Sequence, residues 1–340
     1  MPGIQQYNGA FDDRSKKDKK KDFQHSELFG MASPLEWKEK TFKFYSPQRH
    51  QDGSGACGGF SGALALGINE FFDNGKFEVL SPAYIYQQRT NDGMGMPVID
   101  LCNALVKKGS PKDPLLSSDN LNEVEINSLQ FTQAQIEEAL KYKGLNYLFI
   151  NKDIDTIASV IAGGHAPIFL LRCMDDEYTV DPKVLHPNKV IGQHQFNINH
   201  YITGTDYGMR NGSKVIPVQE SWKDAGLRYF TQDFITNRVE LIFYIIDLPT
   251  EVNPSFSYTF TTPLFFGQNS PMVAKLQEML ASEALFPKDL YTGYYGNITA
   301  SAVKKWQIKH SVASMTEINQ VAGKRFYKKS IDKANQLYSS

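Results

Sequence analysis

The sequence predicts an α+β fold in which a helical half comes first, a strand-rich half follows, and a small helical domain closes the chain. Three observations support this prediction. A glycine-rich segment leads into an apolar, helix-like stretch at residues 62–72. Short runs of β-branched and aromatic residues, separated by Gly, Asn and Pro, then fill much of residues 166–248. Helical spacing of apolar residues returns after residue 263.

The helical half is expected to contain three helices. Residues 62–72 are apolar on nearly every side, as a buried helix is, and an Asp-Asn-Gly sequence ends them. Residues 97–108 place apolar side chains on one face, with Gly109 as terminator. Residues 132–142 begin at Thr132, a residue type that caps helices well.

The strand-rich half is expected to hold five strands, because its apolar runs are too short for helices. Each run is β-branched or aromatic and is bounded by turn-forming residues. The predicted strands are residues 166–172, 200–205, 214–220, 228–230 and 240–248. Helices that precede strands, without alternation between the two, indicate α+β and argue against a parallel α/β sheet.

Four segments follow from the changes in composition along the 340 residues. Residues 1–33 are polar and charged and are expected to form a flexible N-terminal arm. Residues 34–250 form the larger domain. Residues 251–262, rich in Thr, Ser and Pro, are expected to be a linker. Residues 263–340 then form the small helical domain.

The charge balance excludes some partners. The chain has 36 Lys and Arg against 37 Asp and Glu, so neither a nucleic acid nor an anionic membrane surface is expected as a partner. No apolar run is long enough to span a membrane, and the first 30 residues lack the apolar core of a secretory signal. Cell envelope, cytoplasm and phage particle therefore all remain open as locations.

The chain has three cysteines, Cys57, Cys102 and Cys173. They are widely spaced and form no CxxC pair, so the sequence predicts neither a zinc site nor a disulfide framework. No metal and no other cofactor is expected.

Cys57 stands where a thiol can become a nucleophile. It follows a glycine-rich loop and opens an apolar helix, and a helix N-terminus stabilises a thiolate. Gln51 lies six residues earlier in the same loop, where its amide can donate to a developing oxyanion beside the Cys57 N–H. Both residues are therefore candidate catalytic residues, with a buried structural cysteine as the alternative for Cys57.

The segment from Gln51 to Ser61, QDGSGACGGFS, resembles the active-site segment of papain-family cysteine peptidases, QGSCGSCWAFS. The interval from Gln to Cys and the terminal Phe-Ser both match. The resemblance implies a papain-like fold of two lobes, one helical and one antiparallel β, and a thiol-dependent endopeptidase acting on peptides or proteins. The segment from Asn91 to Gly109 resembles the family's substrate-cleft loop, which implies that Gly93 and Gly95 bind substrate.

His200 opens the segment NHYITGTDYG, which is similar to the family's strand NHAVxxVGYG. It follows Cys57 by 143 residues, so the resemblance implies that His200 is the catalytic base. His194 is a competing candidate, although it lacks the following strand pattern. His165 precedes a predicted strand and is interpreted as structural.

The third catalytic position departs from the family, which has Asn-Ser-Trp-Gly after the histidine strand. This chain has QESW at residues 219–222, so Glu220 takes the Asn position. A carboxylate can accept the imidazole N–H and stabilise the cation. Gln219 remains an alternative orienting residue. Trp222 matches the family and is expected to shield the pair from water, whereas Gly58 replaces the family's Trp after the cysteine.

The small domain resembles a peptidoglycan-binding domain. Its segments GQNSPMVAKLQ, from Gly267, and YTGYYGNITASAVKKWQ, from Tyr291, are similar to that family's two helical motifs. The resemblance implies an all-α domain. Tyr294, Tyr295 and Asn297, on the loop at the start of the second segment, are candidate contacts for a glycan or stem peptide, with packing against the peptidase domain alone as the alternative.

The sequence thus predicts a papain-like peptidase with a peptide or protein substrate, directed to cell-wall or envelope material by its last domain, with peptidoglycan as a further candidate partner. One alternative is an inactive papain-like scaffold that serves as a structural or adhesion component, for example of a phage particle. Another is an amidase-like hydrolase of similar fold.

Overall fold

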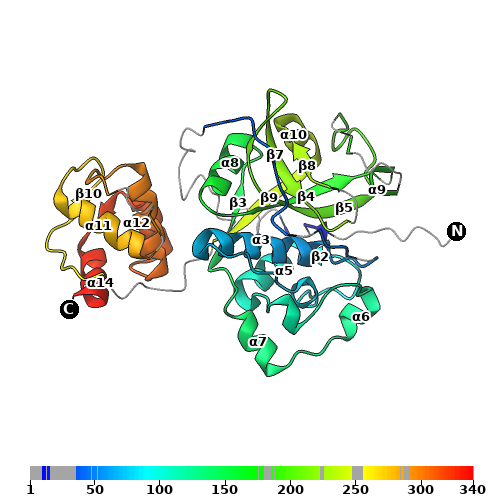
Figure 1. Cartoon of the computed structure of the whole chain (residues 1–340), viewed down its shortest axis with the longest axis horizontal. Coiled ribbons are helices and arrows are strands. Elements are labelled where there is room, and N and C mark those ends of the chain that lie inside the picture. Colours follow the sequence, from blue (N-terminus) through cyan, green and yellow to red (C-terminus); the bar gives the residue numbers. More distant parts are fainter. Residues whose placement is uncertain are drawn as a thin grey trace. The chain divides into compact units, whose positions relative to one another are not determined.

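The computed structural model describes residues 10–12, 14–15, 36–46, 48–51, 53–174, 176–179, 185–186, 188–222, 226–246, 256–283, 285–286 and 291–339. The described residues divide into two compact units, one within residues 10–246 and one within residues 256–339. Part of the predicted linker lies outside the described residues, so the predicted domain limits stay a prediction. Each unit is described by itself (Figure 1).

Helix α3, Cys57–Asn74, is the central element of the first unit. It is buried on almost all sides over its first 13 residues, as its apolar composition predicts. The helix ends at Gly75, whose left-handed backbone (φ 72°) directs its N–H to the Phe71 carbonyl at 2.8 Å. The helix is longer at its start than the sequence pattern indicated, because the glycines after Cys57 are helical.

The helical lobe packs around one side of α3 (Figure 1). Its helices are α4 (Pro82–Tyr86), α5 (Val98–Asn103), α6 (Glu123–Ser128) and α7 (Gln133–Ala139). The predicted helix at 97–108 is α-helical only in α5 and continues as a π-helical turn over Ala104–Lys108. A short 3₁₀ turn, Asp113–Leu115, follows. Thr132 caps α7, as its sequence predicts.

The β lobe is an antiparallel sheet with strand order β3-β9-β4-β5-β7-β6, and β8 pairs with β7. The strands are β3 (Asn146–Ile150), β4 (Pro167–Cys173), β5 (Ile198–Gly204), β6 (Gly208–Arg210), β7 (Ser213–Gln219), β8 (Arg228–Phe230) and β9 (Val239–Ile246). Five correspond to predicted strands. The sequence pattern did not predict β3 and β6, which lie at the two ends of the sheet.

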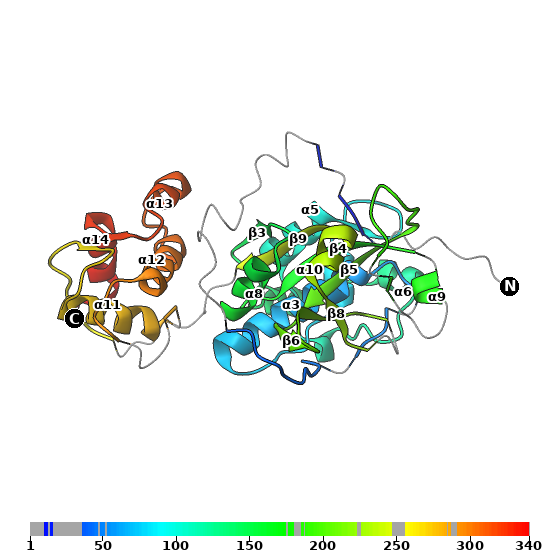
Figure 2. The same ribbon diagram turned by 90° about the horizontal axis from the view of Figure 1, so that it is seen from above.

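The two faces of the sheet pack against different helices. Alternate residues of β4 divide between them: Ile168 and Leu170 join the core around α3, whereas the Phe169 ring meets Phe230 on the other face. Helices α8 (Ile154–Ala162) and α10 (Gln232–Arg238) lie over that second face (Figure 2). A one-turn helix, α9 (Asp176–Thr179), follows β4.

The N-terminal segment is not a free arm where it is described. Strand β1 (Ala10–Phe11) pairs in parallel with β2 (Met96–Pro97), and Ala10 is completely buried. The side chains of Asp12 and Arg14, which form an ion pair, are only 2% and 7% exposed. The prediction of a flexible arm is therefore wrong for residues 10–12 and for Arg14. Most of the remaining residues of that segment, up to residue 33, lie outside the described residues.

The second unit is mainly helical, with α11 (Pro271–Ser282), α12 (Asn297–Lys309), α13 (Met315–Val321) and α14 (Lys328–Tyr338). It also has one antiparallel pair, β10 (Leu264–Phe265) with β11 (Arg325–Phe326), which the expectation of an all-α domain did not include. Its core gathers around Trp306, which is completely buried. Within the described part of the chain, no helix is long and apolar enough to cross a membrane.

Candidate active site

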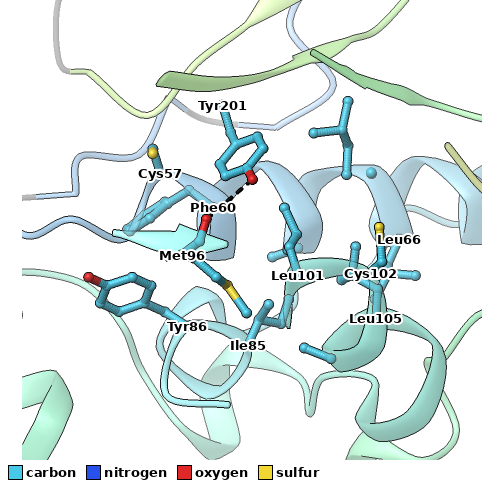
Figure 3. Packing of buried hydrophobic residues seen from close by; sticks show 14 of the residues in the cluster. Cys57, Phe60, Leu66, Ile85, Tyr86, Met96, Leu101, Cys102, Leu105 and Tyr201 are labelled. Atoms are coloured by element: carbon cyan, nitrogen blue, oxygen red, sulfur yellow. Dashed lines mark hydrogen bonds between the residues drawn. The ribbon is translucent and has the colours of Figure 1, made fainter. Parts of the chain in front are cut away.

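Cys57 is the first residue of α3, and no side chain caps the helix start at Ala56. The N–H groups of the first turn and the helix dipole therefore favour negative charge at this position. The Cys57 side chain lies at the edge of the core between the lobes, near Tyr201 (Figure 3). Cys57 is only 1% exposed. The geometry is that of a thiol beside a helix N-terminus, as the sequence predicted.

The loop before Cys57 is held by Glu123, which no sequence pattern marked as a site residue. The Gly55 N–H donates to Glu123 Oε2 at 2.8 Å. The other carboxylate oxygen of Glu123 accepts from the Tyr86 hydroxyl at 2.9 Å and from Arg89 Nη2 at 2.8 Å. A Cβ on Gly55 would lie 2.4 Å from the Gly95 nitrogen, so only glycine fits there. Glu123 thus fixes the backbone that presents Cys57.

His200 comes from β5 and is 2% exposed. Its Nε2 lies 3.1 Å from Glu220 Oε2, which leaves Nδ1 for Cys57. Burial lowers the pKa of His200, but hydrogen bonds to Cys57 and Glu220 and the negative charge of both groups outweigh it. The net effect raises the pKa from 6.5 to about 9. The structure therefore brings the predicted Cys57, His200 and Glu220 together.

Glu220 lies between two cations. Its Oε1 accepts from Arg228 Nε, and its Oε2 faces the His200 ring. Burial alone would raise the pKa of Glu220, but the hydrogen bond to His200 and the charge of Arg228 outweigh burial and lower the pKa. Arg228 was not predicted as a site residue. The sequence offered one indication. Arg228 lies two residues before Phe230 in a short strand, so the two side chains are on the same face.

The competing candidates lie elsewhere. Gln219 is not the orienting residue, because its Oε1 accepts from the Tyr45 N–H at 3.2 Å and its Nε2 donates to the Ser46 carbonyl at 3.1 Å. His194 is exposed, and its Nδ1 accepts from the Val190 N–H at 3.2 Å. The His165 ring packs 5.4 Å from that of Tyr244.

Trp222 and Gln51 frame the site. The Trp222 ring lies edge-on to His200, with 6.3 Å between ring centroids. Gln51 is bonded twice to Ser221, the residue after Glu220. The backbone N–H of Gln51 donates to the Ser221 carbonyl at 3.0 Å, and its side-chain Oε1 accepts from Ser221 Oγ at 2.7 Å. One N–H of the Gln51 amide donates to the Ser54 carbonyl at 2.7 Å. That bond uses one of the two N–H groups of the amide.

The two glycines predicted to bind substrate are engaged with the protein itself. Gly95 is buried, and its N–H donates to the Tyr86 hydroxyl at 2.7 Å. The Asn91 amide donates to the carbonyl of Gly95 at 3.1 Å and to that of Gly93 at 2.9 Å. Strand β1 pairs with the two residues that follow Gly95. Gly93 remains exposed, whereas Gly95 offers no unoccupied N–H to a substrate.

Gly58 and Tyr201 complement each other. A Cβ on Gly58 would meet the Tyr201 ring at 3.2 Å and the Met96 side chain at 3.3 Å. The Tyr201 hydroxyl crosses to the other lobe and donates to the Met96 carbonyl at 3.2 Å (Figure 3). The tyrosine therefore fills space beside Gly58 that a larger residue would need.

The three candidate contacts in the second unit differ in their exposure to solvent. Tyr294 is 49% exposed, and Asn297 is exposed. Tyr295 is completely buried, and its hydroxyl donates to the Gly323 carbonyl at 2.7 Å, so the prediction that it contacts a ligand is wrong. Gly296 is the N-cap of α12, and Thr299 Oγ1, in the first turn, accepts from Gln277 Nε2 at 2.9 Å.

The three cysteines are free and buried. Across the described ranges, no group of three or more His, Cys, Asp or Glu side chains is arranged to hold a metal ion.

No family model matches the chain. No curated protein matches it either. Among solved structures, it is similar to xylellain, a cysteine protease from Xylella fastidiosa. That match has a TM-score of 0.55 and 16% identity, and it covers 70% of this chain and 95% of that one.

Two other solved structures match less closely. One is digestive procathepsin L 3 of Tenebrio molitor, with a TM-score of 0.45, 15% identity and coverage of 58% and 66%. The other is bromelain from Ananas comosus, with a TM-score of 0.44, 13% identity and coverage of 59% and 94%. The likeness to xylellain alone carries the fold assignment. The first unit has the papain-like, two-lobed α+β fold that the sequence predicted.

Proposed function

We propose that the first unit hydrolyses peptide bonds in peptides or proteins through the thiol of Cys57. One observation carries the proposal: a single buried imidazole, that of His200, has hydrogen bonds to Cys57 on one side and to Glu220 on the other. A thiol at a helix N-terminus, next to a cationic imidazole, is stabilised as the thiolate that attacks carbonyl carbon.

The proposed reaction uses these groups in turn. His200 takes the Cys57 proton, and the sulfur forms a bond to the substrate carbonyl carbon while the carbonyl π electrons move to oxygen. The Cys57 N–H and the remaining amide N–H of Gln51 are the proposed donors to that oxyanion. His200 then protonates the leaving amine as the C–N bond breaks. Water, deprotonated by His200, cleaves the thioester and releases the acid.

We further propose that the second unit directs the peptidase to cell-wall or envelope material, with peptidoglycan as ligand. Tyr294 and Asn297 are exposed, and Tyr291 (39%) and Ile298 (52%) are exposed close to them in the sequence. Exposed aromatic faces suit stacking on sugar rings, and an exposed amide suits hydroxyl and amide groups. Buried Tyr295 is left out of this proposal.

A second candidate function is an inactive scaffold that serves as a structural or adhesion component. The observation that favours it is burial: Cys57 is 1% exposed and His200 is 2% exposed. In addition, the Gly95 N–H is occupied by Tyr86. Both reacting side chains therefore expose little surface to a substrate.

Hydrolysis of an unfolded protein such as casein separates the two candidates. The wild type and a Cys102→Ala/Cys173→Ala control should both cleave it, whereas Cys57→Ser in that control should reduce cleavage at least about a thousandfold. Equal residual cleavage by the control and by its Cys57→Ser derivative would favour the scaffold.

Retention of the full chain on purified peptidoglycan tests the second unit. The double variant Tyr294→Ala/Asn297→Ala should be retained less than wild type, whereas Leu337→Ala, a change at another exposed residue of the same unit, should be retained equally. If the wild type is not retained, the proposal that the second unit binds peptidoglycan fails, and the peptidase proposal is unaffected.

A further inference from the structure

The carboxylate of Glu220 is shared between His200 and Arg228 inside the protein. Its two oxygens accept from the His200 ring and from Arg228 Nε, and the Glu220 side chain is completely buried. The Arg228 side chain is 7% exposed. The ion pair is therefore shielded from solvent and from salt, in contrast to a surface pair.

A charge count shows why such a site needs a second cation. With Cys57 as thiolate, His200 as imidazolium and Glu220 as carboxylate, the three groups carry a net charge of −1 in a nearly dry environment. An unpaired charge is strongly disfavoured in such an environment. Arg228 makes the set of four neutral. An amide at position 220 would carry no charge and would need no such partner.

The sheet supplies the geometry. In the β7–β8 pairing, Arg228 is directly opposite Val218, two residues before Glu220. The side chain therefore reaches Glu220 from the neighbouring strand and holds the oxygen that does not face His200. A guanidinium is planar and permanently charged, so it fixes the orientation of the carboxylate as well as its ionisation.

We propose that Arg228 is a positioning residue of the active site, which keeps Glu220 ionised and directed at the His200 ring. This inference rests on the proposed peptidase function. Arg228 acts through Glu220 and touches neither the thiol nor the substrate. Without the charge of Arg228, less opposes the burial that raises the pKa of Glu220, so its hold on the imidazolium weakens and the thiolate–imidazolium pair is lost at a lower pH than in the wild type.

The test is the pH profile of Cys57 alkylation by iodoacetamide, measured in the Cys102→Ala/Cys173→Ala background. The profile should change at the pH where His200 loses its proton. Arg228→Gln should lower that pH by at least about one unit. Arg228→Lys should restore part of the shift, because it returns the charge. Arg210→Gln, which removes an exposed arginine from β6 of the same sheet, should leave the profile unchanged.

A charge-swap cycle gives a second readout. Glu220→Gln alone leaves the Arg228 charge buried beside the imidazolium, so it should lower kcat/KM more than the double variant Glu220→Gln/Arg228→Gln does. If Arg228→Gln fails to fold, the double variant and Arg228→Lys still test the proposal. Circular dichroism checks the folding of each.

The outcomes distinguish the two proposals. If wild-type Cys57 is not alkylated faster than an ordinary exposed thiol, the peptidase proposal fails, and the inference about Arg228 fails with it. If wild-type Cys57 is reactive but Arg228→Gln keeps the wild-type profile, only the role of Arg228 is overturned. A double variant less active than Glu220→Gln also overturns that role.

Discussion

The His200 imidazole and the Glu220 carboxylate face each other with 3.1 Å between Nε2 and Oε2, and both side chains are almost completely removed from solvent. The sequence resemblance to the papain family would place an amide at position 220, where this chain has a carboxylate. Because Nε2 of His200 is hydrogen-bonded to Glu220, Nδ1 is the ring nitrogen that pairs with the sulfur of Cys57. The imidazole is thus held as a cation between two acceptors.

The pH dependence of activity follows from the His200 pKa, which is raised from 6.5 to about 9. The ring keeps its proton through neutral pH and loses it above about 9, so the acid for the leaving amine disappears there. We expect kcat/KM to fall on the alkaline side near pH 9. By linkage, the raised pKa stabilises the folded state fully below 6.5, and this contribution is lost as the pH rises through 9. A fall that begins near pH 6.5 would contradict the prediction.

Gly58→Trp introduces the residue that the papain family has after the cysteine. Because a Cβ at this position already lies 3.2 Å from the Tyr201 ring, the indole should overpack the site and lower the free energy of unfolding by about 1–3 kcal/mol. Urea unfolding measures the loss. The double variant Gly58→Trp/Tyr201→Ala should lose less than the two single variants added together, and strict additivity would show that the two side chains do not compete for space.

Glu123→Gln should loosen the loop that presents Cys57. The change removes the charge that pairs with Arg89 and weakens the hydrogen bond from the Gly55 N–H. We expect a loss of about 1–3 kcal/mol in the free energy of unfolding and slower alkylation of Cys57. Glu137→Gln, at an exposed position of α7, is the control and should change neither. If Glu123→Gln and Glu137→Gln have the same free energy of unfolding and the same alkylation rate of Cys57, then Glu123 does not support the site.

Removal of residues 1–15 should speed alkylation of Cys57. Strand β1 covers Met96 and buries Ala10 completely in the core cluster that also contains Cys57. Without β1, the backbone at Met96–Pro97 has no strand beside it, and we expect reagent to reach the thiol more often. Ala10→Glu in the full chain should act in the same direction, because a buried carboxylate expels the strand. An unchanged rate in both variants would show that β1 does not limit access.

The sequence predicted those site residues that lie in local patterns. The loop and helix around Cys57 form one continuous segment, and the strand that begins near His200 has its own apolar run. Glu220 was found because it follows the next strand at the family's interval. Each of these predictions depends on residues that are neighbours in the chain, and the structure brings all three together.

Residues that join the site through long-range contacts were not predictable. Glu123 lies 68 positions from Gly55, and its partner on the loop is a backbone N–H that carries no sequence pattern. Arg228 is defined as a site residue only by the β7–β8 pairing. Tyr294 and Tyr295 are identical neighbours, and only packing near Gly323 decides that the second is buried.

The decisive test of Cys57 activation by His200 is the relative alkylation rate of the three cysteines in the native protein, read by peptide mass spectrometry. We predict that iodoacetamide at pH 7 modifies Cys57 at least about tenfold faster than Cys102 or Cys173, and that His200→Ala abolishes the difference. Equally slow modification of all three in the wild type, or an unchanged preference in His200→Ala, would contradict an imidazole-activated thiol.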